Sequence, residues 1–257
     1  MSEPTPSTSI SIAAPDAVVA SLRTVVDALP GGVVLVGGWA VRCRLRMARA
    51  AVRATEDLDL LLREDARPAR AALAAVNAAQ ADPAHPCRLE GLPLLVDLLA
   101  DDLPNGVEVA RPGRVDERIE DPDGLVLLVP PFGRLLARSA EWVRLVSEAA
   151  PDGCMVRLPS AGALFAGKVA NVALDFRTPE KRASDGEDVV RLIEAFGALA
   201  LLSDLVNATP EERADLREHL VQLGAGGLAG QARAARLDHD PARLKIAVSR
   251  VVDGLAT

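Results

Sequence analysis

The sequence predicts an α/β (α+β) protein in which a small mixed sheet core is followed by a C-terminal helical domain. Over residues 16–100, segments with helical spacing alternate with short apolar runs, which is typical of a sheet packed against helices. From Ser160 onward the signals are helical, with start residues before each apolar-periodic segment. We therefore divide the chain into a disordered lead (1–14), a core domain (15–158) and a helical domain (159–257).

The first half of the chain alternates helices and strands. The lead is rich in Ser, Thr and Pro, a composition typical of disorder. Residues 16–29 carry apolar side chains on one helical face, and "PGG" at 30–32 ends that helix. The run "VVLVGG" predicts a strand that ends in two glycines. The same alternation predicts a helix over 39–52, a strand over 57–62, a helix over 66–81 and a strand over 92–100.

The pattern changes after residue 103. Residues 106–131 combine turn signals with short β-type runs, and residues 136–160 fit a hairpin that turns at "APDG". The run "GAGGLAG" at 224–230 is interpreted as a flexible connection between helices. The last hundred residues otherwise predict helices over 160–176, 185–206 and 209–227.

Composition argues against several classes of protein. Cys43, Cys87 and Cys154 are far apart and suggest neither disulfides nor a zinc site, as expected of thiols in a reducing cytosol. No apolar run reaches the roughly 20 residues of a membrane span, and no leader pattern is present. We expect a cytoplasmic protein without membrane contact. The formal charge of −7 argues against binding nucleic acid through overall charge, but it permits a local basic groove.

Three acidic residues in apolar strands indicate a site for a cation. Asp57 and Asp59 point to the same face of their strand, and Asp97 is the only polar residue in its own apolar strand. Buried together without a counter-charge, these carboxylates would repel one another. Magnesium prefers such oxygen ligands, and three acids on two strands can hold two metal ions. The sequence therefore predicts Asp57, Asp59 and Asp97 as a magnesium site.

A glycine pair provides the second element of such a site. Gly37 and Gly38 end a strand and precede a helix, where backbone N–H groups without a neighbouring Cβ can approach a phosphate. The spacing is neither that of a dinucleotide-binding fingerprint nor that of a P-loop. Alone, a glycine pair in this place is more often a simple turn.

Together these segments resemble a known superfamily. "VGGWAV", "RATEDLDLLL" and "LLVDLL" resemble the core motifs of the DNA polymerase beta-like nucleotidyltransferases, over residues 33–100. The segment from "VRLPSAGALFAGKV" to "SDGEDVVRL" is similar to the C-terminal motif of the AbiEii-type group, which includes the MenT toxins. The positions that match this motif are Lys168, Arg177, Lys181, Arg182, Asp185 and Asp188. "SDGEDVV" departs from the motif, so the functional acid is either Asp185 or Asp188, of which Asp188 is preferred.

The resemblance implies a magnesium-dependent nucleotidyltransferase with a nucleoside triphosphate (NTP) as substrate. Gly37, Gly38, Arg53, Thr55 and Lys168 would bind the nucleotide, while Asp57, Asp59 and Asp97 would hold the metal. Asp97 would also help to deprotonate the acceptor, and Asp188 would orient Lys168 or an arginine. On the residues alone, Lys168 lies in an apolar helix and either reaches an anion or forms a structural ion pair with Asp188.

The acceptor is less determined than the chemistry. The AbiEii and MenT resemblance implies the 3′ end of a tRNA and a toxin that an antitoxin partner neutralises. Two alternatives stay open: an antibiotic nucleotidyltransferase acting on aminoglycosides or lincosamides, and an inactive nucleotide-binding module. The basic run at 42–49 is either a solvated helix face or a support for a polyanionic acceptor. His85, His219 and His239 are isolated, and we expect them at the surface.

Overall fold

The structure is a computed structural model that describes residues 10–63, 69–101, 112–115, 117–120, 124–174 and 177–256. The described residues form a nine-stranded mixed sheet and eight α-helices, which confirms the predicted α/β (α+β) class. The strands are β1 Ser11–Ala13, β2 Val33–Val36, β3 Leu58–Leu62, β4 Arg88–Leu89, β5 Val96–Ala100, β6 Glu117–Glu120, β7 Val126–Val129, β8 Glu141–Val146 and β9 Cys154–Leu158. The helices are α1 Asp16–Ala28, α2 Gly37–Met47, α3 Arg70–Ala75, α4 Gly133–Arg138, α5 Ala161–Ala173, α6 Pro179–Asp204, α7 Pro210–Ala234 and α8 Pro241–Gly254.

The register of the central strands gathers charged residues on one face. The sheet order is β1-β8-β9-β2-β3-β5-β7-β6, and β4 pairs with β5 beside this path. Asp59 on β3 lies opposite Asp97 on the parallel strand β5, and Asp97 lies opposite Arg88 on the antiparallel strand β4. Residues opposite one another in neighbouring strands point to the same face of a sheet. Asp59, Asp97 and Arg88 therefore share one face.

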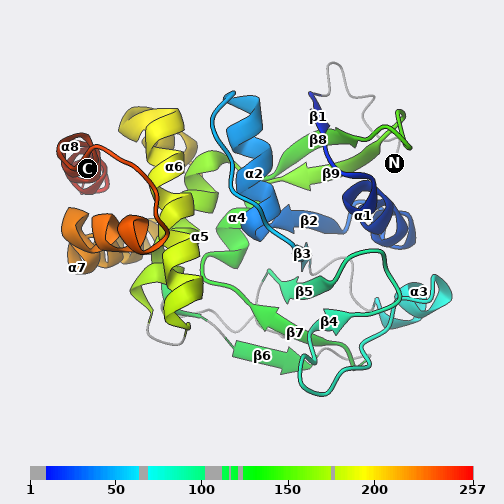
Figure 1. Ribbon diagram of the computed structural model, residues 1–257. Helices are drawn as coiled ribbons and strands as arrows, with labels where there is room; N and C mark the ends of the chain where they lie inside the picture. Colours follow the sequence, from blue (N-terminus) through cyan, green and yellow to red (C-terminus); the bar gives the residue numbers. More distant parts are fainter. Residues whose placement is uncertain are drawn as a thin grey trace.

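The helices of the C-terminal half gather at one end of the molecule (Figure 1). Helix α2 contacts β2 and β3 on one side and α5 and α6 on the other, so it connects the sheet with this group. Buried side chains of both halves, such as Leu60 on β3 and Val169 on α5, belong to one hydrophobic cluster. The division at residues 158 and 159 stays a prediction.

Several predicted elements are confirmed. The three strands expected before residue 101 are β2, β3 and β5, and the expected hairpin is β8 and β9, with Leu145 opposite Cys154 and the turn at 150–153. Helices α1, α5, α6 and α7 lie where helical spacing predicts them, although the bounds differ by several residues. None of the described helices is long and apolar enough to cross a membrane.

Two segments predicted to be flexible are ordered. Residues 11–13 of the expected disordered lead form β1, which pairs in parallel with β8, and Ile12 is buried. An open sheet edge offers unpaired N–H and C=O groups, which is why a short extended segment can be recruited there. Residues 1–9 of the lead lie outside the described part of the chain. The run at 224–230 is interpreted as a connection between helices, and α7 is indeed broken at Gly224, whose dihedral angles are not helical (φ 58°, ψ 173°). The rest of the run is helical, and Leu228 in it is fully buried.

Two predicted helices differ from those observed. The helix expected over 39–52 begins at Gly37 and ends at Met47, and Arg49 then has a left-handed φ of 56°. Of the helix expected over 66–81, α3 covers six residues, and residues 64–68 lie outside the described part. Asn77 has a φ of 58°, which ends the helical spiral, and Ala79 pairs with Glu90 as an isolated bridge. The sequence pattern did not indicate α4 or the short strand β4.

Candidate functional site

A cleft of about 450 Å³ lies where the N-terminus of α2 meets β3, β5 and the helices α5 and α6. Gly37, Gly38, Arg53 and Thr55 line it, as do the acids and the lysine that the sequence singled out: Asp57, Asp59, Asp97 and Lys168. Six cationic and four acidic side chains line the cleft, although the whole chain carries a formal charge of −7. The cleft is therefore more basic than the protein as a whole and suits an anionic ligand.

The two glycines are needed because side chains approach the turn closely. Gly37 has a φ of 63°, and a Cβ on it would lie 1.8 Å from Asp59 Oδ2. A Cβ on Gly38 would lie 2.8 Å from Thr55 Oγ1 and 3.0 Å from Arg53 Nη2. The N-terminus of α2 has no side-chain cap, because the N-cap residue is Val36. Its first N–H groups are thus open to an anion in the cleft.

The acids of the cleft are unequally neutralised. Asp97 receives two hydrogen bonds from Arg88, from Nε to Oδ1 at 2.8 Å and from Nη2 to Oδ2 at 3.1 Å. Asp57 has a looser counter-ion, since Lys181 Nζ lies 3.6 Å from its Oδ2. Burial raises the pKa of Asp59 to about 6, and the positive charge of Lys168 opposes this rise while the negative charge of Asp97 adds to it. Asp59 is therefore the acid in this group whose charge is least compensated.

The donor chemistry of the cleft fits magnesium, but the acids are not gathered around one point. Four carboxylates line the cleft, one of which, Asp185, is paired with Lys168, and carboxylate oxygens are the ligands that Mg²⁺ prefers in proteins. No three acidic, histidine or cysteine side chains within the described ranges form a ready-made metal site. Asp57 and Asp59 are the pair with cleft-facing negative charge, and Asp97 is held by Arg88. The structure thus fits a cation at Asp57 and Asp59 first.

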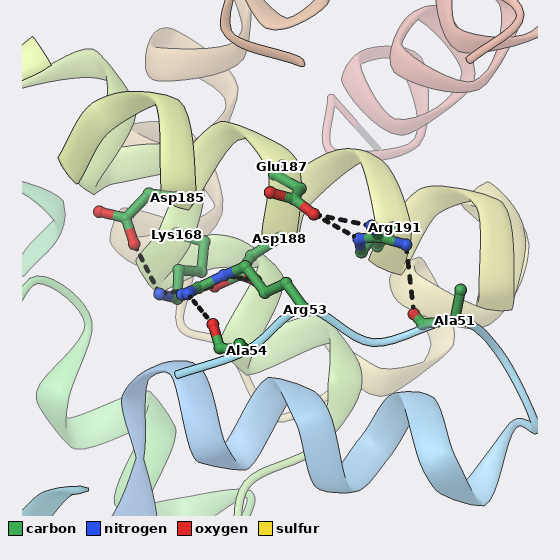
Figure 2. Close-up of polar contacts among 8 residues, drawn as sticks. All are labelled: Ala51, Arg53, Ala54, Lys168, Asp185, Glu187, Asp188 and Arg191. Atoms are coloured by element: carbon green, nitrogen blue, oxygen red, sulfur yellow. Dashed lines mark hydrogen bonds and ion pairs between the residues drawn. The ribbon is translucent and has the colours of Figure 1, made fainter. Parts of the chain in front are cut away.

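A second set of charges lies at the wall of the cleft, where the segment before β3, α5 and α6 meet. Lys168 Nζ is 2.5 Å from Asp185 Oδ1 and 2.9 Å from Asp188 Oδ2 (Figure 2). Arg53 donates to both oxygens of Asp188, at 2.7 Å and 3.0 Å. We call Arg53, Lys168, Asp185 and Asp188 the buried charge network; its lysine and both acids are at least 93% buried.

The buried charge network is internally compensated. Burial tends to raise the pKa of Asp188, but Lys168 and Arg53 outweigh it and hold that pKa below its usual value. Burial likewise tends to lower the pKa of Lys168, and Asp185 and Asp188 outweigh it, so this pKa is raised. Both aspartates bind the lysine, and Asp188 alone also binds Arg53. The choice between Asp185 and Asp188 is therefore not exclusive in this structure.

The network also fixes the segment that carries Arg53 and Thr55. Arg53 Nη1 donates to its neighbour Ala54 O at 3.0 Å, and Arg191 on α6 donates to Ala51 O at 3.4 Å (Figure 2). Arg191 is itself held by Glu187 at 2.7 Å. The C-terminal helices thus position residues 51–55, the segment before β3, which contacts the glycine turn.

Some residues of the site were not predicted from the sequence. Arg88 lies on β4, a two-residue strand without a sequence signal, and Arg118 on β6 also lines the cleft. Asn171 lies one helical turn after Lys168, and its Oδ1 is buried without a hydrogen-bond partner in the described residues. Its spacing from Lys168 could have indicated that it faces the same side of α5.

Two expectations about surface residues are wrong. His219 is fully buried on α7, and its Nε2 lies 2.9 Å from Gly113 O. Its isolation in the sequence did not indicate that the distant 3-10 helix Pro112–Arg114 would cover it. Arg44, in the basic run at 42–49, is 8% exposed and donates to Pro159 O and Leu158 O, so it joins α2 to the end of β9. Cys43, Cys87 and Cys154 are free thiols.

Comparisons with known proteins yield distant structural likeness to solved structures. No family model matches the chain, and no curated protein matches it. Among solved structures, the solution structure of the antibiotic-resistance factor ANT(2'')-Ia matches with a TM-score of 0.39 and 18% sequence identity. The match covers 78% of this chain and 95% of that chain.

Proposed function

We propose that this protein is a magnesium-dependent nucleotidyltransferase that moves a nucleoside monophosphate from an NTP to an acceptor hydroxyl. One observation carries the proposal. The Asp59 carboxylate lies directly against Gly37 at the uncapped start of α2, a position that a Cβ on residue 37 would block. The uncapped start of α2 and the least compensated carboxylate are thus neighbours in a cleft that has more cationic than acidic side chains. A bound triphosphate would need these three features together.

The side chains of the cleft have distinct roles in this proposal. The N–H groups at Gly37 and Gly38 bind phosphate oxygens, and Arg53 and Thr55 stand beside them. Asp57 and Asp59 would hold magnesium, and Asp97 would join them as the third ligand. Lys168 contributes positive charge from the back of the cleft, and Asp188 positions both Lys168 and Arg53. When bound, magnesium would neutralise phosphate charge and polarise the reacting phosphorus.

The reaction is an in-line displacement. The acceptor oxygen forms a bond to the α-phosphorus, the bond to the bridging oxygen breaks, and pyrophosphate leaves. The proton of the acceptor hydroxyl passes to a carboxylate, for which Asp97 is the candidate. Catalysis of this kind depends on positioning and charge neutralisation, which a rigid sheet edge with flanking cations can supply.

For the acceptor, we propose the 3′ end of a tRNA and the role of a toxin restrained by an antitoxin protein. The support is the AbiEii-type and MenT-type motif around Lys168, Asp185 and Asp188, together with the basic lining of the cleft. A cationic drug would suit the acidic chain as a whole, but it would meet six cationic side chains in the cleft. An aminoglycoside or lincosamide acceptor is thus the second candidate.

A transfer assay tests both candidates. Purified protein with Mg²⁺ is incubated with each α-labelled NTP and with bulk tRNA, an aminoglycoside and lincosamide panel, or no acceptor. We expect label in tRNA, lost on addition of a chelator. Label in a drug alone would replace the tRNA proposal by the antibiotic one. NTP binding without transfer to any acceptor would contradict the enzymatic proposal and leave an inert nucleotide-binding module.

A growth assay tests the toxin role separately. Expression of the wild-type chain is expected to arrest growth, and Asp59→Asn is expected to abolish the arrest. Asp238→Asn, at an exposed position distant from the cleft, is the matched control and should still arrest growth. Normal growth with active wild-type enzyme would contradict the toxin role.

A further inference from the structure

The ion pair between Arg88 and Asp97 differs from the other ion pairs of the cleft. Arg88 holds both oxygens of Asp97 with its planar fork, at 2.8 Å and 3.1 Å. The two residues lie directly opposite in the β4 and β5 ladder, so the backbone fixes the contact. Leu89, the neighbour of Arg88 on β4, is fully buried and anchors the strand. The contact is therefore built into the sheet.

This pair is more exposed than the acids of the buried charge network, of which Asp185 lines the cleft and Asp188 does not. The side chains of Arg88 and Asp97 are 18% and 30% exposed, whereas Asp188 is 1% exposed. Arg88, Asp97 and Asp59 all line the same cleft. A ligand in the cleft can therefore reach Arg88, while it cannot reach the carboxylate that holds Arg53.

The guanidinium fork fits a phosphate as well as a carboxylate. Arg recognises both groups with two parallel N–H···O bonds. If a phosphate replaced Asp97 as the partner of Arg88, the guanidinium would stay paired. The carboxylate of Asp97, next to Asp59, would then be released. Asp97 lies opposite Asp59 in the β3 and β5 ladder, so a freed Asp97 adds negative charge beside Asp59 that a cation can neutralise.

From this geometry we propose that Arg88 couples nucleotide binding to metal binding. Without nucleotide, Arg88 is hydrogen-bonded to Asp97 and keeps this carboxylate from binding magnesium. The triphosphate takes the Arg88 guanidinium, Asp97 is released, and the third carboxylate becomes available to the metal. This inference rests on the proposed nucleotidyltransferase function for the identity of the ligand. It assigns Arg88 as a triphosphate-binding residue and as the positioning residue for Asp97.

The coupling can be measured without catalysis. Mn²⁺ replaces Mg²⁺ as the probe and is counted by electron paramagnetic resonance, with and without each α,β-methylene NTP, in which the scissile bridge is blocked. In the wild-type chain, nucleotide should tighten Mn²⁺ binding by about tenfold, within the usual range of coupling between sites. In Arg88→Gln, Mn²⁺ alone should bind more tightly than in wild type, and nucleotide should add little. Arg243→Gln, at an exposed position on α8, is the matched control and should behave as wild type.

Asp97→Asn gives an opposite and sharper prediction. With Asp97 neutral, Arg88 is free for phosphate, so binding of the methylene NTP in the presence of EDTA should become tighter. In Arg88→Gln the same metal-free binding should weaken, by about tenfold. A merely structural ion pair would weaken nucleotide binding in both variants, or in neither. Circular dichroism and thermal melting check each fold, and Arg88→Lys, which keeps the charge without the fork, replaces Arg88→Gln if that variant does not fold.

Two results would overturn the inference. One is wild-type Mn²⁺ affinity in Arg88→Gln without nucleotide, and the other is no gain in metal-free nucleotide binding in Asp97→Asn. These failures are separate from failure of the proposed function. Coupling without transfer to any acceptor would remove the enzymatic proposal alone, and transfer without coupling would remove the role of Arg88 alone.

Discussion

Acidic side chains lie in poorly solvated surroundings in two regions of the molecule, and the two regions differ in how far these charges are neutralised. In the buried charge network, Asp185 and Asp188 share Lys168, and Asp188 also binds Arg53 through two hydrogen bonds. In the cleft, Asp59 has a raised pKa of about 6, and its neighbour Asp97 adds negative charge. In the first region the positive and negative side chains neutralise one another, and the network supports the fold. The second leaves the negative charge of Asp59 poorly compensated, as the proposed magnesium site requires.

The largest expected effect is a loss of activity without a loss of stability when the acid of the cleft is neutralised. Asp59→Asn should lower nucleotidyl transfer by about 10³-fold, because the metal loses a charged ligand. It should not lower the free energy of unfolding at pH 7.5, because the folded state already disfavours the charge of Asp59. Steady-state transfer kinetics and urea denaturation check both parts, with Asp238→Asn as the control. Clear destabilisation by Asp59→Asn would remove the contrast between the regions.

Breaking the buried charge network should instead reduce stability. Lys168→Met leaves Asp185 without its closest partner and Asp188 with Arg53 alone. Removing one partner from a buried ion pair costs about 3 to 5 kcal/mol of unfolding free energy. Urea denaturation measures this cost, and Lys245→Met, at an exposed position on α8, is the matched control. A Lys168→Met variant as stable as its control would show that the network does not support the fold.

The glycine turn gives the next largest effect. Gly37→Ala should destabilise the protein by about 1 to 3 kcal/mol and weaken nucleotide binding, since the new Cβ meets Asp59 Oδ2 at 1.8 Å and the backbone has a positive φ. Gly31→Ala is a close control, because Gly31 also has a positive φ, 74°, but nothing lies within 4 Å of its Cβ position. Thermal melting and NTP titration compare the two. Equal effects would mean that φ strain matters and the contact with Asp59 does not.

The last expected effect is a dependence of stability on pH, spread over about two pH units. The pKa of Asp59 is higher in the folded chain, about 6, than the ordinary aspartate value of 3.8. Between these two values the folded state binds more protons than the unfolded state, so the contribution of Asp59 to stability falls as pH rises from about 4 to about 6. The difference in unfolding free energy between wild type and Asp59→Asn should follow this fall and level off above it. A flat difference across this window would contradict the raised pKa.

Sequence pattern predicted the elements that alternate regularly and missed those that depend on distant partners. The periodicity at 16–29 and 160–176 led directly to α1 and α5, because one-sided burial leaves a repeating signal. Strand β1 is three residues long and exists because β8 offers an edge, which no local pattern encodes. Strand β4 is two residues long, and this explains why Arg88 was not among the predicted site residues.

The sequence by itself determined which chemical groups could meet: two glycines after a strand, two acids one residue apart, a third acid in an apolar strand and a lysine in an apolar helix. Their spacing predicted a shared site, and the structure places them along one cleft. Only the tertiary structure decided which charges neutralise one another. Arg53 and Asp188 are 135 residues apart in the chain, and His219 is buried by a turn 106 residues away. The physical reason is that burial leaves a periodic trace in the sequence, whereas ion pairing depends on distances in space that only the folded chain sets.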